Sequence, residues 1–346
     1  MASARISGVR LTGLAAAVPS SVRGVEDLAG WMGEADAAKV AKETGVRERR
    51  VAPSRTCTSD LCQAAARALL AAAPPKTVDV LVFVSQTPDY FLPATSALLQ
   101  HRLGLARGCA AFDVNLGCSG YVYGLWIAAS IVAAGGARVA LVLSGDTITR
   151  FLDAGDRSTV PLFGDAGTAT LLEADATAAP MVFHLSTDGA GGNHLVVPGG
   201  AFRHGFGAPA DDGAKTPSTL HMNGPEIFAF TLREVPPLVG DTLDLAGWGA
   251  EEPDAFVCHQ ANRFILEFLR RKIGIAADRF VIGLERYGNT SSASIPLAMV
   301  TELGDRLRGQ RLKLLLAGFG VGLSWGGAAV EAGPLVVPPL MEIDAA

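Results

Sequence analysis

Short apolar runs alternate with longer helix-like stretches along this chain. The runs are bounded by turn residues, and we predict them to be buried strands. They are Val78–Val84, Ala110–Val114, Val139–Leu143, Ala169–Leu172, Ala255–Cys258, Leu312–Ala317 and Ala328–Val330. The predicted helices are Thr58–Ala72, Ala94–Leu103, Ser119–Ala134, Ala261–Ile273 and Ser292–Leu307. Such alternation favours parallel strand–helix–strand units in an α/β protein whose helices cover its sheets.

The order of these segments repeats after about half of the chain. Three strand-and-turn segments of the first half resemble three of the second, at offsets of about 170 residues. They pair Asp79–Phe83 with Asp254–Cys258, Phe112–Val114 before Cys118 with Phe280–Ile282 before Asn289, and Ala140–Leu143 with Leu314–Ala317. We therefore predict a duplicated α/β unit, with one half at residues 1–176 and the other at residues 177–346.

Two regions break the repeat. The segment from Ser186 to Pro217 is rich in glycine and poor in apolar residues, which predicts an inserted system of surface loops. Such loops often shape the entrance for a substrate. The residues after Pro334 are predicted to form a short extension.

Composition and charge narrow the classes of function. With 346 residues, 49% of them hydrophobic and 18% charged, the chain can build a large core. Its net charge of −5 argues against nucleic acid as a partner, because phosphate binding needs a basic surface. No leader-like segment opens the chain, and apolar runs such as Val139 to Leu143 are too short to cross a bilayer. We expect a cytoplasmic protein without a membrane partner.

Cysteine and histidine spacing gives no support for a disulfide framework or a metal site. The chain has five cysteines, at Cys57, Cys62, Cys109, Cys118 and Cys258, and none of them forms a CxxC pair. Most are expected to be small buried apolar residues. Compact ligand spacing is also missing among His184, His194, His204 and His221. We therefore expect no metal.

Cys118 stands apart from the other cysteines because a helix is predicted to start beside it. The Gly117-Cys118-Ser119-Gly120 turn follows a predicted strand and opens an apolar helix. Unpaired backbone N–H groups and the helix dipole favour thiolate over thiol at such a place. The flanking glycines allow substrate and backbone to come close. Cys118 is therefore a candidate nucleophile, the alternative being one more buried cysteine.

Two polar residues occupy corresponding strand-to-helix turns in the second half. His259 follows the strand that ends at Cys258, where it is a candidate catalytic histidine or a helix-capping one. Asn289 precedes a helix and, taken alone, is a helix cap. The repeat changes this interpretation, because related halves bring the ends of equivalent strands to one crevice. Cys118, His259 and Asn289 are then predicted to converge.

The glycine cluster Gly318 to Gly327 is a poor nucleotide-binding loop. It lacks the Lys-Ser/Thr ending of a phosphate loop, and no acidic residue follows at the dinucleotide spacing. We therefore expect no cofactor. A tight turn with an exposed backbone N–H near the cysteine suits an oxyanion hole better. The Gly164-Asp165-Ala166-Gly167 segment is predicted to be a structural turn.

Together these residues resemble the β-ketoacyl-acyl carrier protein synthase III family of the thiolase-like superfamily, over nearly the whole chain. The matching segments are Thr44–Arg49, Thr87–Tyr90, Gly117–Gly120, Asp156–Arg157, Phe163–Asp165, His259–Asn262, Gly288–Ser291 and Phe319–Gly322. The resemblance implies a five-layered αβαβα fold, a homodimer and a Cys118-His259-Asn289 triad. It also implies an oxyanion hole made by the backbone N–H groups of Cys118 and Gly322.

The resemblance implies a two-step acyltransferase. An acyl thioester of coenzyme A or of acyl carrier protein would acylate Cys118, and a malonyl thioester would then lose carbon dioxide and attack the acyl group. His259 and Asn289 would hydrogen-bond the enolate. Fatty-acid initiation and a specialised polyketide-type pathway are both compatible, and the second is favoured.

The substrate-binding side departs from the family pattern. Glu43 stands where members that use acetyl-coenzyme A commonly have arginine, and Trp31 lies upstream of their adenine-stacking tryptophan. Five residues still resemble substrate-contacting positions: Leu92 and Met222 of the acyl tunnel, Arg157 of the adenine site, and Arg271 and Lys272 of the basic face for the carrier protein. A solvated helix face is the alternative for the last two.

Two other functions remain open from the sequence. Simple acyl transfer to an oxygen or nitrogen nucleophile would need only Cys118 and His259, with His259 as general base. A non-catalytic partner subunit could borrow the fold, although an intact triad argues against it. Retention of Asn289, a second donor for an enolate, favours decarboxylative condensation.

Overall fold

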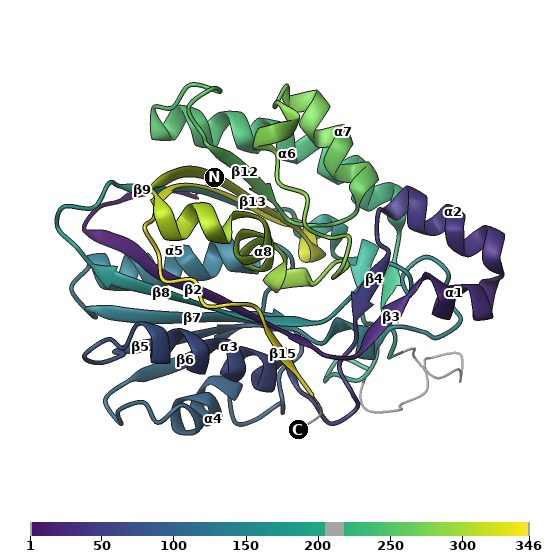
Figure 1. Cartoon of the computed structure of the whole chain (residues 1–346), viewed down its shortest axis with the longest axis horizontal. Helices are drawn as coiled ribbons and strands as arrows, with labels where there is room; N and C mark the ends of the chain where they lie inside the picture. Colours follow the sequence, from purple (N-terminus) through teal and green to yellow (C-terminus); the bar gives the residue numbers. More distant parts are fainter. Residues whose placement is uncertain (1, 205–217, 345–346) are drawn as a thin grey trace.

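Two mixed sheets are stacked in the structure, a computed structural model that describes residues 2–204 and 218–344 (Figure 1). The first sheet has the order β15 (Met341–Ile343), β2 (Val9–Pro19), β8 (Ala166–Ala174), β7 (Val139–Asp146), β5 (Val80–Val84), β6 (Ala110–Val114). The second has the order β1 (Ala2–Ile6), β9 (Met181–Thr187), β14 (Ser324–Ala332), β13 (Leu312–Gly320), β12 (Ala255–Cys258). Two short pairs join β3 (Val22–Gly24) to β4 (Glu48–Arg50) and β10 (Leu195–Val196) to β11 (His221–Met222).

Helices form the other three layers, which confirms the predicted five-layered αβαβα arrangement. In Figure 1, α6 (Gly224–Ala246) and α7 (Arg263–Ile273) lie at the top, and α3 (Thr58–Ala72) and α4 (Thr95–Arg102) lie at the bottom. Between the sheets run α5 (Gly120–Ala133) and α8 (Ser294–Gly309). To one side lie α1 (Val25–Met32) and α2 (Glu34–Thr44).

Burial on both faces explains why the strands are continuously apolar. On β5, Val80, Val82 and Val84 point into the central core around α5 and α8, whereas Leu81 and Phe83 point toward α3. Side chains alternate in this way along any strand, so a strand covered on both sides needs apolar residues at every position. This double burial is why the strands appear in the sequence as short, uninterrupted apolar runs.

Strand pairing repeats in the two halves. In the first sheet β2 pairs antiparallel with β8, β8 antiparallel with β7, and β7 parallel with β5, which is parallel to β6. In the second sheet β9, β14, β13 and β12 pair in the same order and directions. A single parallel bridge from Phe256 to Phe280 takes the place of the last strand. The division at residues 1–176 and 177–346 into two domains stays a prediction, because β1 and β15 each pair with the other half's sheet.

Several elements were not predicted. The strand β2 contains Leu-Ala-Ala-Ala-Val, and alanine is a weak strand former, so its signal is poor. The helix α6 contains Pro236 and Pro237, which normally argue against a helix interior. The segment predicted as loops from Ser186 contains the end of β9, a 3₁₀ turn at Gly189–His194 and β10, and residues 205–217 lie outside the described residues. Within residues 2–204 and 218–344, every helix is too short or too polar to cross a membrane.

Candidate active site

Cys118 lies in the turn between β6 and α5, with its neighbour Ser119 as the N-cap of the helix. Its side chain is buried. Glycine is required beside it, because a Cβ atom at Gly117 would lie 2.5 Å from Oε1 of Gln86 and 2.6 Å from Cγ1 of Val321. The turn therefore packs directly against segments from both sheets.

His259 extends the line of β12 into the same region. Its backbone N–H donates to the carbonyl of Ala317 at 2.8 Å, which continues the ladder with β13 by one residue. Its Nδ1 lies 2.7 Å from Oγ of Ser294, and its ring meets the ring of Phe319 edge to face at 5.4 Å. These contacts fix the ring plane and leave Nε2 as the nitrogen to face a substrate.

Asn289 is held in place through its backbone. Its N–H donates to the carbonyl of Leu162 at 2.8 Å, and its carbonyl accepts from the N–H of Gly164 at 3.0 Å. A Cβ atom at Gly164 would lie 2.1 Å from the carbonyl oxygen of Tyr287, so the glycine allows this close approach. Oδ1 of Asn289 accepts from the N–H of Ser291 at 3.0 Å, which leaves the amide NH₂ as a donor for another group.

Ser291 contacts all three candidates. Its Oγ lies 4.0 Å from Sγ of Cys118, its N–H bonds the side chain of Asn289, and its backbone hydrogen-bonds His259. The residue has a φ of 50°, which is uncommon for a residue other than glycine and often marks a functional site. The three residues predicted to converge therefore do so around one strained serine. Sequence reasoning saw only helix-capping residues here and missed it.

Burial sets the protonation of the two ionisable groups. It raises the pKa of Cys118 to about 11, with a further rise from the carboxylate of Asp146, opposed by hydrogen bonds from Ser291 and the N–H of Val321. Burial also lowers the pKa of His259 to about 3, opposed by the bond to Ser291. At neutral pH the pair is thus a thiol and a neutral imidazole. The backbone N–H groups of Cys118 and Val321 do favour the thiolate, as expected for a helix start, but desolvation outweighs them.

The glycine cluster approaches the cysteine closely. A Cβ atom at Gly320 would lie 2.9 Å from Sγ of Cys118. The backbone N–H that bonds this sulfur belongs to Val321, one residue before the Gly322 expected from the sequence. Gly322 has a left-handed φ of 75° within the turn Val321–Leu323. Val321 is thus a further backbone donor that the sequence did not reveal, since its side chain carries no signal for a role of its N–H.

The two predicted tunnel residues lie in different surroundings. Leu92 precedes α4 and is 79% exposed, so among residues 2–204 and 218–344 it lines no enclosed space. Met222, on β11, packs against the cluster of Ile148, Leu162 and Phe163. Because Leu162 also bonds the backbone of Asn289, Met222 lies close to the candidate site.

The predicted cationic residues lie away from the buried site. Arg157 donates to Oδ2 of Asp36 at 3.0 Å, and both side chains are exposed. On α7, Arg271 is exposed, and Nζ of Lys272 donates to the carbonyl of Leu232 at 2.8 Å. These three residues are available to a large substrate only at the surface.

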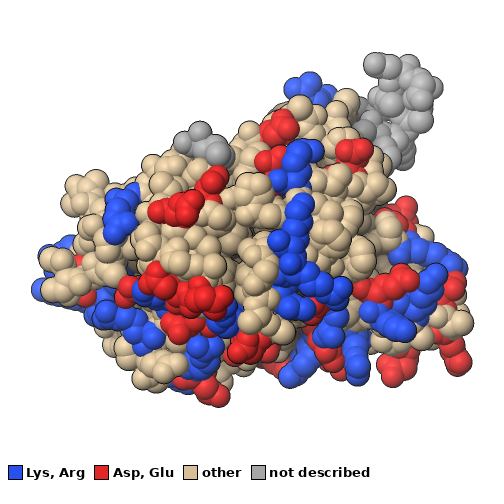
Figure 2. Space-filling view, turned by 90° about the horizontal axis from the view of Figure 1, so that it is seen from above, with Lys and Arg blue, Asp and Glu red and all other residues tan. Residues whose placement is uncertain are grey.

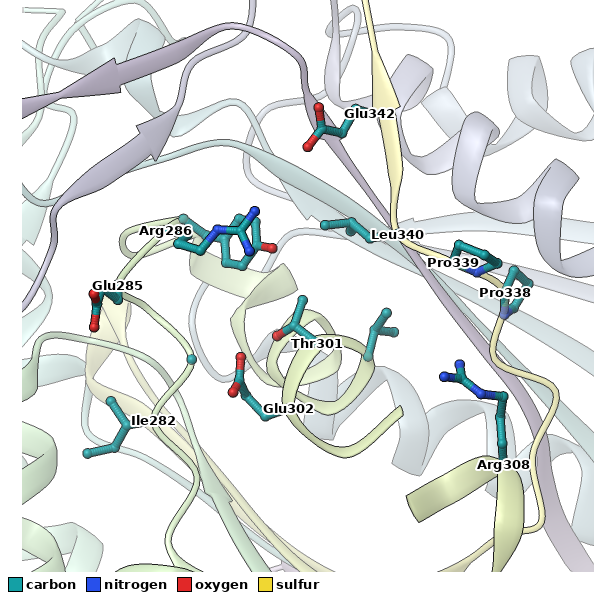
Figure 3. A pocket seen from close by; sticks show the side chains of 13 residues that line it. Ile282, Glu285, Arg286, Thr301, Glu302, Arg308, Pro338, Pro339, Leu340 and Glu342 are labelled. Carbon is teal, nitrogen blue, oxygen red and sulfur yellow. The ribbon is translucent and has the colours of Figure 1, made fainter. Parts of the chain in front are cut away.

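Two cavities lie beside the site rather than in it. One of about 740 Å³ is lined by α8, the 282–287 segment and the C-terminal tail, where Arg286, Glu302 and Arg308 surround it (Figure 3). Another of about 380 Å³ is lined by residues that include Trp31 and Arg49. Within the described ranges, neither includes a residue of the candidate triad in its lining.

Two family models match the chain. The one described as 3-oxoacyl-[acyl-carrier-protein (ACP)] synthase III matches residues 112–189, and the one described as the C terminal of 3-oxoacyl-[acyl-carrier-protein (ACP)] synthase III matches residues 243–332. Cys118 lies in the first match, and His259 and Asn289 lie in the second.

Similar proteins cover most of the chain. A β-ketoacyl-[acyl-carrier-protein] synthase III of Desulfitobacterium hafniense (strain Y51) is 40% identical over 299 residues, which are 84% of this chain and 88% of the relative. The crystal structure of a 3-oxoacyl-(acyl-carrier protein) synthase from Burkholderia xenovorans LB400 is 43% identical, with a TM-score of 0.94 and 99% of each chain covered. The priming β-ketosynthase of the R1128 polyketide biosynthetic pathway is 28% identical, with a TM-score of 0.84 over 96% of this chain and 98% of the other. The similarity thus extends through both sheets.

Proposed function

This chain belongs to the β-ketoacyl-[acyl-carrier-protein] synthase III family, and we propose that it transfers an acyl group through Cys118 to a malonyl thioester. It is an acyltransferase with a five-layered thiolase-like fold, in a family of decarboxylative condensing enzymes. The observation that carries the residue assignment is the shared contact of Cys118, His259 and Asn289 with Ser291 in a buried site. Water is largely excluded there, so each hydrogen bond to a developing charge has a large effect.

In the first step, the thiol of Cys118 attacks the carbonyl carbon of an acyl thioester. Neutral His259 takes the thiol proton, and the proton then goes to the departing thiol as its carbon–sulfur bond breaks. The N–H groups of Cys118 and Val321, which both hydrogen-bond the sulfur in the resting site, would stabilise the oxyanion. Gly322, the donor expected from the sequence, remains the alternative to Val321.

In the second step, a malonyl thioester loses carbon dioxide and becomes an enolate. The NH₂ of Asn289 and the ring of His259, in the tautomer that carries its hydrogen on Nε2, donate to its thioester oxygen, where the negative charge collects. The enolate carbon then attacks the acyl carbon, the bond to sulfur breaks, and the released thiolate of Cys118 takes a proton from solvent. The product is a β-ketoacyl thioester.

The carrier of each substrate is proposed to be coenzyme A or an acyl carrier protein. Figure 2 looks onto the face that carries α6 and α7, where a run of Lys and Arg crosses the middle of the view. The last turn of α7 contributes Arg270, Arg271 and Lys272. Basic side chains of this kind suit an acidic protein partner. The relative from the R1128 pathway supports a priming reaction of the polyketide type.

A homodimer is proposed from the surface around β6. This strand is the free edge of its sheet, and edge strands commonly pair with a second chain. Four large apolar side chains are exposed elsewhere on loops of this chain, at Tyr90, Phe91, Leu92 and Phe202. A second copy would cover such a patch and could bring Leu92 to an acyl tunnel.

Intact-protein mass spectrometry tests the function. The wild-type chain is exposed to a panel of acyl thioesters, then to a malonyl thioester. We expect one acyl adduct on Cys118, absent from Cys118→Ala, and its discharge with release of carbon dioxide. Cys57→Ala, which changes a cysteine outside the site, should keep the adduct. A product that retains the malonyl carboxylate, or an ester, would instead support simple acyl transfer.

A further inference from the structure

Asp146 is a buried carboxylate at the end of β7, and it accepts hydrogen bonds from two other segments. Its Oδ1 accepts from the N–H of Gln86 at 2.7 Å and from the hydroxyls of Ser85 and Thr87 at 3.2 and 3.3 Å. Its Oδ2 accepts from the N–H and the hydroxyl of Ser292 at 3.2 and 2.8 Å. Asp146 thus ties the end of β5 and the Asn289 loop to the end of β7.

These bonds reach the candidate triad by one further step. Ser292 follows Ser291, whose side chain also hydrogen-bonds Asp146 and whose backbone bonds both His259 and the side chain of Asn289. The carboxylate therefore holds the turn on which the two donors depend. Ser291 needs such support, because a positive φ persists only where its surroundings enforce it.

We propose that Asp146 is a positioning residue that fixes the Ser291–Ser292 turn and so aligns His259 and Asn289 with Cys118. The proposal rests on the roles proposed above for the triad. Asp146 makes no step of the reaction itself. The condensation step requires both donors at once, so it depends more on this alignment than acylation does.

The carboxylate has a second effect on the site through its charge. Burial raises the pKa of Asp146, whereas the hydrogen bonds from Gln86, Ser292 and Ser291 lower it, and each oxygen accepts a backbone N–H, an arrangement that suits the ionised form. The groups that act on the Cys118 sulfur are the carboxylate of Asp146, the hydroxyl of Ser291 and the N–H groups of Val321 and of Cys118 itself. Of these, only Asp146 carries a negative charge and opposes a thiolate. Removing that charge should lower the pKa of Cys118.

Asp146→Asn in the full chain separates the two effects, with Asp165→Asn as the matched control. Asp165 is equally buried and accepts from the N–H groups of Ala52 and Thr149 at 2.8 and 3.0 Å, but it does not bond the Ser291 turn in the described structure. Three rates are measured for each variant. The first is alkylation of Cys118 by iodoacetamide as a function of pH, with the modified residue located by peptide mapping. The other two are acylation of Cys118 and carbon dioxide release from a malonyl thioester.

For Asp146→Asn, the alkylation midpoint should fall by about one pH unit, a tenfold rise in thiolate at neutral pH. Carbon dioxide release should fall on the order of 10²-fold relative to acylation. Asp165→Asn should change neither the alkylation midpoint nor the rate of carbon dioxide release relative to acylation. Unchanged values in Asp146→Asn, or equal shifts in both variants, would overturn the proposal.

If Asp146→Asn does not fold, Ser292→Ala tests the positioning role in its place. It keeps the charge and removes one donor, so condensation should fall relative to acylation while the alkylation midpoint stays in place. An unchanged ratio in a folded Ser292→Ala would overturn the positioning role. The proposed function fails separately, if the wild-type chain is not acylated on Cys118 at all.

Discussion

The two halves place different residues at the ends of equivalent strands. In the first half, β6 leads to Cys118 and β7 ends on Asp146. In the second half, the equivalent of β6 is the segment at Phe280, which leads to Asn289; β12, the equivalent of β5, leads to His259, and β13, the equivalent of β7, ends on Gly320. One half thus supplies the nucleophile and a negative charge, and the other supplies donors and a backbone that tolerates close contact. A complete site needs both.

The strand at the β6 position, which leads to Cys118 in the first half and to Asn289 in the second, differs most between the halves. In the first, β6 pairs along its length with β5, whereas in the second only Phe280 bridges to Phe256. Because the chain leaves the second sheet early, Asn289 can bond the backbone of Leu162 in the first half. A regular strand beside β12 would hold that segment at the sheet edge. The irregularity therefore carries a donor into the site.

His259→Ala, which removes the imidazole that the second half contributes, should have the largest effect on the reaction. Acylation at neutral pH loses its base, and condensation loses a donor to the enolate, a fall of about 10⁴-fold for the complete reaction. Since the pKa of Cys118 is about 11, raising the pH toward that value should restore acylation but not condensation. His184→Ala, at another buried histidine, is the control. Equal loss of both steps at every pH would contradict the separate roles.

Asn289→Ala and Asn289→Asp form a pair that tests the donor alone. Aspartate keeps the acceptor for the N–H of Ser291 but lacks the NH₂ group. Both variants should therefore reduce carbon dioxide release on the order of 10²- to 10³-fold and leave acylation of Cys118 much less affected. Normal release by Asn289→Asp would mean that the donor is not used.

Gly320→Ala tests the close contact between the halves. The added Cβ atom would lie 2.7 Å from Cβ and 2.9 Å from Sγ of Cys118, so the cysteine or the turn must move. We expect unfolding to become easier by about 1–3 kcal/mol in a denaturant titration, with slower acylation. Gly240→Ala, in α6 with open space around it, should be neutral or stabilising. Wild-type stability and acylation in Gly320→Ala would contradict the observed contact.

Arg271→Glu should have the smallest effect, confined to the outer face of the second half. If α7 receives an acidic carrier protein, KM for a carrier-bound substrate should rise roughly two- to fivefold, as expected for an exposed ion pair. KM for the coenzyme A thioester should not change. Lys76→Glu, an exposed charge reversal in the first half, is the control. A similar rise in both variants would indicate a general charge effect.

The sequence predicted those elements that a local pattern of apolar residues and turns marks. The strands Ala110–Val114 and Ala255–Cys258 and the helix Thr58–Ala72 have the expected bounds, because apolar runs between clear turns mark them. His259 was identified for the same reason, as a polar residue directly after such a run, and Cys118 because a glycine-flanked turn places it at a predicted helix start. Alanine-rich β2 and the proline-containing α6 were missed because their local propensities oppose their structure.

The supporting residues were beyond the reach of the sequence. Asp146 bonds the hydroxyl of Ser292 across 146 positions of the chain, and no local pattern marks either partner. The positive φ of Ser291 is imposed by those long-range bonds. The raised pKa of Cys118 could not be predicted for a related reason, since burial depends on how the whole fold closes over the turn.

The exchange of terminal strands limits how far the two halves can be separated. The N-terminal strand β1 pairs with β9 in the second sheet, and the C-terminal strand β15 pairs with β2 in the first. A chain cut between the halves would leave each fragment with an edge strand that belongs to the other, and with one face of α5 or α8 uncovered. The two repeated halves thus form an obligate pair. We expect co-expressed fragments to recover a folded enzyme by split-protein complementation, and neither fragment to fold alone.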